Sequence, residues 1–190
     1  MAGTVVSWAK DLNEVPYGPL GIIAMNGCEK IGEMINTWLL KWHSLEEDTD
    51  TQFYTVPGGN RDSFLIKAYC PRFGTGEGKG LIKESVRGLD IYIISDVTNY
   101  SMTYTMYDQV VPMSPDDHYQ DLKRVIAAIG GKAKRVNVIM PFLYESRQHR
   151  RTSRESLDCA MALQELESMG VENIITFDAH DPRVVNAVPQ

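Results

Sequence analysis

The sequence predicts a single α/β domain built on a doubly wound, mostly parallel sheet. Short apolar segments alternate with amphipathic helical segments along the chain, and this order implies parallel strands joined by right-handed crossovers. The clearest strand, L-D-I-Y-I-I-S-D (89–96), is apolar almost to its end. Unbroken apolar strands are typical of parallel sheets that helices cover on both faces.

The amino-terminal elements are a strand and a helix. L-G-I-I-A-M, starting at Leu20, predicts a strand, and residues 29–42 predict an amphipathic helix. The apolar face of that helix is expected at Ile31, Met34, Ile35, Trp38 and Trp42. The acidic stretch 44–51 and P-G-G-N (57–60) predict loops, and S-F-L-I-K-A-Y (63–69) predicts the next strand.

Residues 113–131 form the helix with the best-defined ends. Ser114 is a natural N-cap, Pro115 suits the first helical position, and Asp117 completes a capping box. The glycines at 130 and 131 end the helix. Its apolar face is expected at Tyr119, Leu122, Ile126 and Ile129. A strand over 135–142, a helix over 153–170 and a strand over 171–178 complete the pattern.

Composition excludes several classes of protein. The net charge is −6, which argues against nonspecific nucleic-acid binding. No run of 18 apolar residues predicts a membrane span, and the first ten residues do not resemble a signal peptide. The three cysteines form no C-x-x-C pair, so we expect buried reduced thiols in a cytoplasmic protein. Residues 1–19 are expected to be an extension before a domain over 20–190.

Polar residues follow three of the predicted strands. Ser95 and Asp96 end one strand, Y-E-S-R-Q-H-R-R (144–151) follows another, and Asp178 and His180 end the last. Because ligands bind outside the carboxyl ends of the strands in open α/β sheets, these groups are expected at one rim.

The basic segment R-Q-H-R-R-T-S-R (147–154) carries four arginines. Guanidinium groups match phosphate oxygens, and a helix start adds N–H donors. A solvated loop that pairs with nearby acids is the alternative. Asp178 with His180 suits Mg²⁺ and phosphate chemistry, although a strand-end acid that caps a turn is again an alternative. The glycine-rich stretch 72–80 fails the Walker A pattern and predicts a flexible hairpin tip.

Four ordered blocks resemble one family. G-L-I-K-E-S-V-R-G-L-D-I-Y-I-I (80–94) is similar to the G-E-S-V-R-G-x-D-V-Y-I-I signature of ribose-phosphate pyrophosphokinases, also called phosphoribosyl pyrophosphate synthetases. R-F-G-T-G-E (72–77) resembles the adenine-binding turn of that family, K/R-F-x-D/N-x-E. Y-E-S-R-Q-H-R-R resembles Y-A-R-Q-D-R-K, and I-I-T-F-D-A-H (174–180) resembles V-I-T-M-D-L-H.

The resemblance implies a phosphoribosyltransferase-like sheet and transfer of the diphosphoryl group of ATP to ribose 5-phosphate with Mg²⁺. Phe73 would stack on adenine and Glu77 would contact its amino group, in the site of a neighbouring subunit of a homo-oligomer. Arg147 and Gln148 would hold ATP. His180 would be the catalytic residue and would contact the Mg²⁺ of the metal-bound triphosphate, and Asp178 would also serve the metal.

The chain also departs from the family pattern. His149 stands where the family has Asp, and residues 97–107 are richer in aromatic side chains than the usual connection. The ribose-phosphate loop D-D-x-x-D-T of the second half is missing from the sequence. We therefore expect an amino-terminal half that is inactive alone. A regulatory or scaffold relative that associates with an active synthetase is the main alternative, and a nucleotide-binding module of another enzyme is a minor one.

Overall fold

A four-stranded parallel sheet forms the centre of the molecule in this computed structural model, which describes residues 18–47 and 62–187. The strand order is β1 (Leu20–Ala24), β4 (Asp90–Ile94), β7 (Arg135–Ile139) and β8 (Asn173–Ile175). The pairing is in parallel register throughout, from Leu20 opposite Asp90 to Ile139 opposite Ile175. Residues 1–17 of the extension expected over 1–19, and the turn expected at 57–60, lie outside the described residues.

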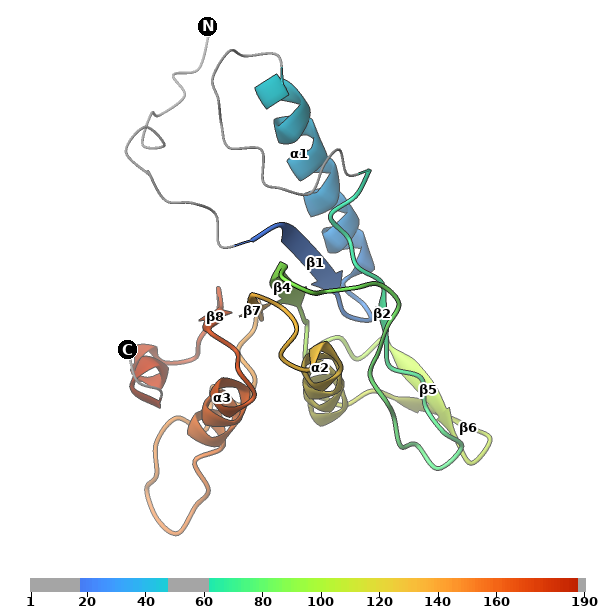
Figure 1. The fold of residues 1–190 in the computed structure, drawn as a ribbon. Helices are drawn as coiled ribbons and strands as arrows, with labels where there is room; N and C mark the ends of the chain where they lie inside the picture. The colour runs from blue at the N-terminus through green and yellow to red at the C-terminus, as the bar shows by residue number, and fades with distance from the viewer. Residues whose placement is uncertain (1–17, 48–61, 188–190) are drawn as a thin grey trace, which may run out of the picture.

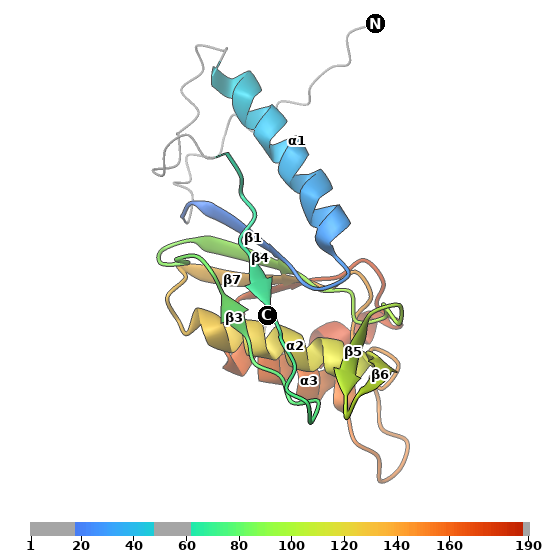
Figure 2. The same cartoon turned by 90° about the vertical axis from the view of Figure 1, so that its right-hand side faces the viewer.

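Helices cover both faces of the sheet, which confirms the doubly wound α/β prediction. Figures 1 and 2 show α1 (Glu29–Glu47) on one face, and α2 (Pro115–Ile129) and α3 (Asp158–Ser168) on the other. A short 3-10 helix, η2 (Pro182–Ala187), packs near α3. The larger core lies between the sheet and α2 and α3, while a small cluster around Ile22, Cys28 and Ile94 lies under α1. No described helix is long and apolar enough to cross a membrane.

Helix α2 has the ends and the buried face that its sequence predicts. The Ser114 side chain accepts a hydrogen bond from the Asp117 N–H, and the Asp117 carboxylate accepts one from the Ser114 N–H. Gly130 ends the helix in the left-handed conformation, with φ of 57°. The four apolar residues predicted for its face, Tyr119, Leu122, Ile126 and Ile129, are all buried.

Helix α1 is correctly predicted as a helix, but of its predicted apolar face only Ile35 packs against the sheet. The side chains of Met34, Trp38 and Trp42 are each more than half exposed. The helix approaches the sheet through Gly32, where a Cβ would lie only 2.7 Å from the Cβ of Ala24. This close approach turns the line through Gly32, Ile35 and Leu39 toward the sheet, so the indole rings point away from the core.

Several predicted bounds need correction. The segment 63–69 is not one strand, because Leu65 makes an isolated parallel bridge to Ile22 and β2 (Ala68–Tyr69) pairs elsewhere. Residues 44–47 continue α1 instead of forming a loop. Helix α3 starts at Asp158, five residues later than the sequence predicts, because residues 153–157 lie in the loop that precedes it.

Two antiparallel hairpins lie beside the sheet. One pairs β2 with β3 (Leu81–Ile82), and its tip holds the glycine-rich stretch, as predicted. The other pairs β5 (Thr103–Met106) with β6 (Gln109–Pro112) and is not predicted by the sequence analysis. Figure 2 shows both hairpins on the α2 side of the sheet.

Candidate functional site

The loops that follow β7 and β8, residues 140–149 and 176–181, run side by side at one rim and are called the rim loops below. The backbone N–H groups of Phe177 and Asp178 donate to the Pro141 carbonyl, at 3.1 and 2.9 Å. The Leu143 N–H donates to the Asp178 carbonyl at 3.1 Å. The parallel sheet therefore brings the 144–151 block and the Asp178–His180 segment together, as the sequence predicts.

A cavity of about 720 Å³ opens at the carboxyl ends of the strands. Asp96 and Asp178, both singled out from the sequence, lie in its wall, together with Cys28, Lys30 and Thr98, which were not. The signal for Cys28 and Lys30 was available, because M-N-G-C-E-K follows the first strand just as the predicted rim residues follow theirs, and Thr98 comes two residues after the predicted Asp96. The apolar part of the wall is formed by Ile31, Met34, Ile94, Pro141, Phe142 and Phe177.

The carboxylates of the two aspartates in the cavity wall differ in their hydrogen-bond partners. The Asp96 carboxylate accepts hydrogen bonds from the N–H and the hydroxyl of Thr98, at 2.9 and 2.7 Å. Asp96 therefore serves a turn, which is the ordinary role of a strand-end acid. Asp178 is exposed, and its carboxylate bonds to no described residue. Of the two, Asp178 is the one free to face a ligand.

A cluster around His149 joins the two rim loops. Its ring lies 5.7 Å from the ring of His180, and its Nε2 lies 3.4 Å from Asp181 Oδ2. Arg183 pairs with the same carboxylate at 2.6 Å. The hydrogen bonds from Arg183 hold the pKa of Asp181 well below its usual range, with a smaller contribution from His149. His180 itself is exposed at the rim.

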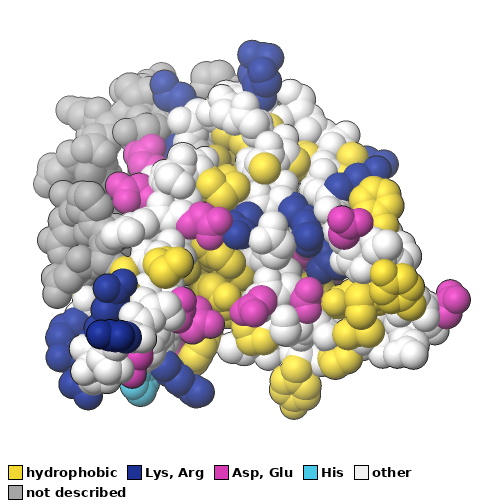
Figure 3. Space-filling view, turned by 90° about the horizontal axis from the view of Figure 1, so that it is seen from below, with side chains coloured by type: hydrophobic (Ala, Val, Ile, Leu, Met, Phe, Trp, Pro, Cys, Tyr) yellow, Lys and Arg dark blue, Asp and Glu magenta, His cyan; other side chains and the backbone are white. Residues whose placement is uncertain are grey.

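The loop that carries Arg147 is held by its glutamine, which leaves its arginines free. Gln148 Nε2 donates to the Ser156 carbonyl at 2.8 Å, and this bond closes the loop ahead of α3. The guanidinium groups of Arg147, Arg150, Arg151 and Arg154 are exposed and pair with no described residue. Figure 3 shows basic side chains gathered at the corner of the molecule where this loop protrudes. The alternative of a basic loop paired with local acids finds no support among the described residues.

Phe73 and Glu77 lie elsewhere, in the segment 72–78, which is called the glycine turn below. The Phe73 N–H donates to the Glu77 carbonyl at 2.7 Å, and Thr75 Oγ1 donates to the Glu77 carboxylate at 2.9 Å. Both predicted side chains are exposed. Figures 1 and 2 show this turn across α2 from β8, so one copy of the chain does not bring it to the rim loops.

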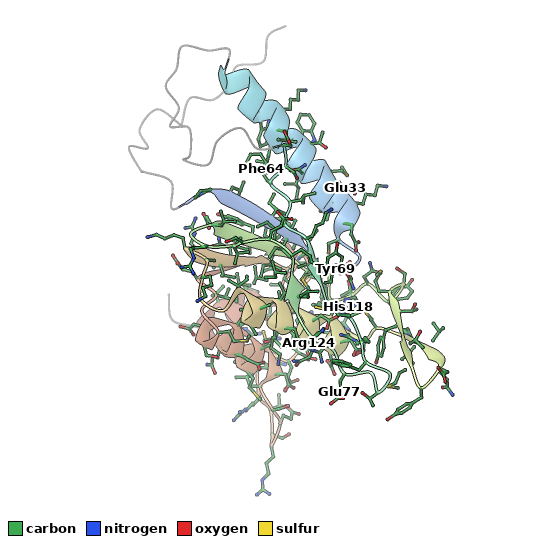
Figure 4. All side chains as sticks on the ribbon, turned by 45° about the vertical axis from the view of Figure 1, so that its right-hand side comes forward. Glu33, Phe64, Tyr69, Glu77, His118 and Arg124 are labelled. Carbon is green, nitrogen blue, oxygen red and sulfur yellow. The ribbon has the colours of Figure 1, made fainter. Side chains whose placement is uncertain are left out.

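Buried charges anchor the glycine turn to α2. Arg72 Nη1 and Arg124 Nη1 lie 2.5 and 2.7 Å from the same Asp121 oxygen. The Arg72 and Asp121 side chains are only 7% and 4% exposed, and Arg72 Nε and Nη2 have no described partner. Figure 4 shows Arg124 on α2 near the loop that carries Glu77. The Arg124 side chain also packs closely against Gly78, where a Cβ would lie 2.9 Å from Arg124 Nη1.

The cysteines offer no nucleophile at the site. All three are free and buried, as the sequence predicts. Burial raises the pKa of the Cys28 thiol to about 11, although the thiol accepts a hydrogen bond from the Asp96 N–H at 3.2 Å. A thiol with that pKa stays protonated near neutral pH, so Cys28 contributes to packing at the cavity wall.

Among the described residues, no three His, Cys, Asp or Glu side chains converge on a metal position. Mg²⁺ does not require such a cluster, because it often takes one or two carboxylates and completes its shell with water and phosphates. The free Asp178 carboxylate in the cavity wall suits that mode of binding. The His180 imidazole suits phosphate contact better than direct binding of Mg²⁺, which prefers oxygen ligands.

Comparison with known proteins places this chain in a family. Residues 20–170 match the family described as the N-terminal domain of ribose phosphate pyrophosphokinase. The chain is 30% identical to the ribose-phosphate pyrophosphokinases of Corynebacterium ammoniagenes and Bacillus subtilis over 122 residues, which is 63% of this chain and 34% of each relative. It is 32% identical to ribose-phosphate pyrophosphokinase 1 of Schizosaccharomyces pombe over 111 residues, which cover 57% of this chain and 24% of that relative.

A solved structure supports the same fold. The phosphoribosylpyrophosphate synthetase of Mycobacterium smegmatis superposes with a TM-score of 0.60 at 19% identity, over 89% of this chain and 45% of that one. The chain spans only about a third of the length of the curated bacterial relatives it matches. By its match over residues 20–170, this chain belongs to the family of ribose-phosphate pyrophosphokinase N-terminal domains.

Proposed function

We propose that this chain is the ATP-side domain of a ribose-phosphate diphosphokinase that works in the cytoplasm for nucleotide biosynthesis. The complete protein would transfer the β,γ-diphosphoryl group of ATP to ribose 5-phosphate. The anomeric hydroxyl attacks the β-phosphorus, the bond from that phosphorus to the α,β-bridging oxygen breaks, and AMP leaves. The observation that supports the proposal most is the placement of the exposed Arg147 and His180 on the two adjoining rim loops. The same loops supply Pro141, Phe142 and Asp178 to the cavity wall.

Each rim residue has a role that its chemistry allows. The Arg147 guanidinium donates two hydrogen bonds to phosphate oxygens and offsets their negative charge. Such a role suits phosphoryl transfer, which depends mostly on positioning and electrostatics. Gln148 keeps the loop in shape through its bond to the Ser156 carbonyl. His180 donates to a phosphate oxygen, which stabilises the charge that develops in the transition state. Asp178 would hold Mg²⁺, which neutralises triphosphate charge when bound.

The adenine end of the site would come from a second copy of the chain. Phe73 and Glu77 are exposed on the glycine turn, across α2 from the rim loops. An exposed aromatic ring suits stacking on a base, and the Glu77 carboxylate can accept a hydrogen bond from the adenine amino group. The proposal therefore includes a homo-oligomer in which the glycine turn of one subunit reaches the rim loops of another.

Transfer of label from [β-³²P]ATP to ribose 5-phosphate tests the function. Full-length protein with Mg²⁺ should form labelled phosphoribosyl pyrophosphate, while the 190-residue chain alone should form little, because it lacks the ribose-phosphate loop of the family pattern. Absence of transfer by the full-length protein would contradict the proposal.

A regulatory or scaffold role is the second candidate, and His149 is the observation that favours it. Its imidazole packs against His180 and lies beside Asp181. The contacts between the two rim loops therefore involve a histidine at a position where the family pattern has Asp. Co-purification with an active synthetase, together with no binding of ATP by the full-length protein, would establish this role. Binding of ATP with measurable transfer would exclude it.

A further inference from the structure

The β5–β6 hairpin is docked on the glycine turn through contacts from three of its residues. The Tyr107 N–H at its tip donates to the Gly74 carbonyl at 2.9 Å. Met106 fills the space over Gly76, where a Cβ would lie 2.7 Å from Sδ. The Tyr104 ring lies 4.9 Å from the Arg72 guanidinium carbon. The hairpin and the glycine turn therefore form one unit on α2.

The tip of the hairpin has an unfavourable backbone that presents an aromatic ring. Tyr107 and Asp108, the two central residues of the turn, have φ of 49° and 61°. Such a two-residue turn favours Asn-Gly or Asp-Gly, since positive φ is uncommon for a bulky side chain. Backbone strain of this kind persists only where the surrounding structure imposes it. Here the bond to Gly74 fixes the tip in place.

Two aromatic rings thus reach solvent from adjoining parts of the unit. Phe73 is 54% exposed and Tyr107 is 71% exposed, and the bond between Tyr107 and Gly74 keeps their backbones close. Figure 3 shows hydrophobic side chains gathered at the hairpin end of the molecule, away from the basic corner. Neither ring packs on another described aromatic ring. Lys79 Nζ lies 6.0 Å from the centroid of the Phe73 ring, so a flat ligand would stack on the other face of Phe73 and on the Tyr107 ring.

We propose that Tyr107, at the tip of the β5–β6 hairpin, is a further base-binding residue, which extends the adenine surface that the proposed function assigns to Phe73 and Glu77 of the glycine turn. This inference rests on the proposed function. Two aromatic side chains provide sequence-tolerant stacking for a base, and Glu77 on the same unit contributes the polar contact.

Equilibrium binding of two ligands to the full-length protein tests the role of Tyr107. The ligands are ATP and inorganic tripolyphosphate, each with Mg²⁺; only ATP carries a base. Tyr107→Ala should weaken ATP binding about tenfold, as expected for loss of one stacking contact, and leave tripolyphosphate binding unchanged. Tyr107→Phe should bind ATP as wild type does. Tyr100→Ala is the matched control, because Tyr100 is 84% exposed on the same connection but is not at the tip.

A second variant separates the ring from the backbone. Tyr107→Gly also removes the ring but adopts positive φ without strain, so it should lose ATP affinity as Tyr107→Ala does. Equal losses for ATP and tripolyphosphate, or a changed oligomeric state at unchanged ATP affinity, would overturn the proposal. If wild type binds ATP and Tyr107→Ala binds it more weakly but neither catalyses transfer, the proposed function fails and the base-binding role stands. If wild type does not bind ATP, both fail.

Discussion

The rim loops and the glycine turn present exposed side chains on two different kinds of support. The rim loops are joined by backbone hydrogen bonds at Pro141 and Asp178, and the side chain of Arg147 is exposed. The glycine turn is fixed to α2 by buried side-chain charges, Arg72 and Arg124 on Asp121. An exposed residue such as Arg147 can therefore be changed at the rim without loss of structure, whereas the glycine turn depends on the buried Asp121 carboxylate.

The largest effect is expected at that carboxylate. Asp121→Ala leaves the Arg72 guanidinium buried without its anionic partner, and breaking such a pair costs roughly 3–5 kcal/mol. Denaturant unfolding of the full-length protein measures the loss. Glu167→Ala, at an exposed position of α3, should change the free energy of unfolding by less than about 0.5 kcal/mol.

A double replacement sharpens the comparison. Arg72→Met combined with Asp121→Leu removes the buried Arg72–Asp121 pair and leaves Arg124, whose side chain is 22% exposed, to be solvated by water. We expect the double variant to recover much of the loss, because apolar groups of similar volume often replace a buried ion pair without cost. If Asp121→Ala cost under about 1 kcal/mol, the pair would be solvated and the claimed support for the glycine turn would be wrong.

The next effect concerns ligand binding at the rim. Arg147→Ala should weaken binding of ATP to the full-length protein by roughly 1–3 kcal/mol through loss of a charge-assisted contact, with no change in thermal stability. The ATP affinity of Arg147→Lys should lie between those of wild type and Arg147→Ala, because lysine keeps the positive charge but cannot donate the paired hydrogen bonds of a guanidinium. Lys134→Ala is the control, since Lys134 is an exposed cation at the opposite end of the strands. Unchanged ATP affinity in Arg147→Ala would remove that residue from the site.

The same comparison explains what could be predicted from the sequence. The rim follows from a general rule, because apolar strands such as 90–94 predict a parallel sheet and parallel strands end at one edge. The anchoring of the glycine turn could not be predicted in this way, because no sequence pattern links Arg72 to Asp121, which is 49 residues away. The β5–β6 hairpin was missed because Tyr107-Asp108 is not a favoured two-residue turn, although T-Y-T-M alternates as a strand does.

Helix α1 shows a second limit of periodicity. The spacing of apolar residues identified the helix, but of the five residues predicted for its buried face only Ile35 packs against the sheet. The sheet-facing side is set by Gly32, which allows a close backbone approach that the pattern of apolar residues does not reveal. Helix α2 was predicted in full because its capping box, its glycine end and its four buried residues all agree.

Helix α2, against which the glycine turn packs, should lose stability when its N-cap residue is replaced. Ser114→Ala removes the acceptor for the Asp117 N–H, and we expect the free energy of unfolding to fall by about 1 kcal/mol. The effect should be smaller than for Asp121→Ala, because the freed N–H is exposed to water. Ser114→Asp should retain most of the stability. Equal stability in Ser114→Ala and wild type would mean that the capping box contributes nothing to α2.

The smallest effect is expected at the rim, from the pH dependence of the Asp181 pair. Arg183 lowers the pKa of Asp181 in the folded protein, with a smaller contribution from His149, so ionised Asp181 favours the folded state above its unfolded pKa, about 3.9. That contribution is lost as the pH falls from about 4 toward the lower folded pKa. Thermal unfolding of wild type and Asp181→Asn should therefore differ near neutral pH and converge in acid. The difference should be slight, because Arg183 is well exposed and water screens the pair. If the stability difference between wild type and Asp181→Asn grew as the pH fell, its pH dependence would be opposite to that expected, and the pairing of Asp181 with Arg183 would be ruled out.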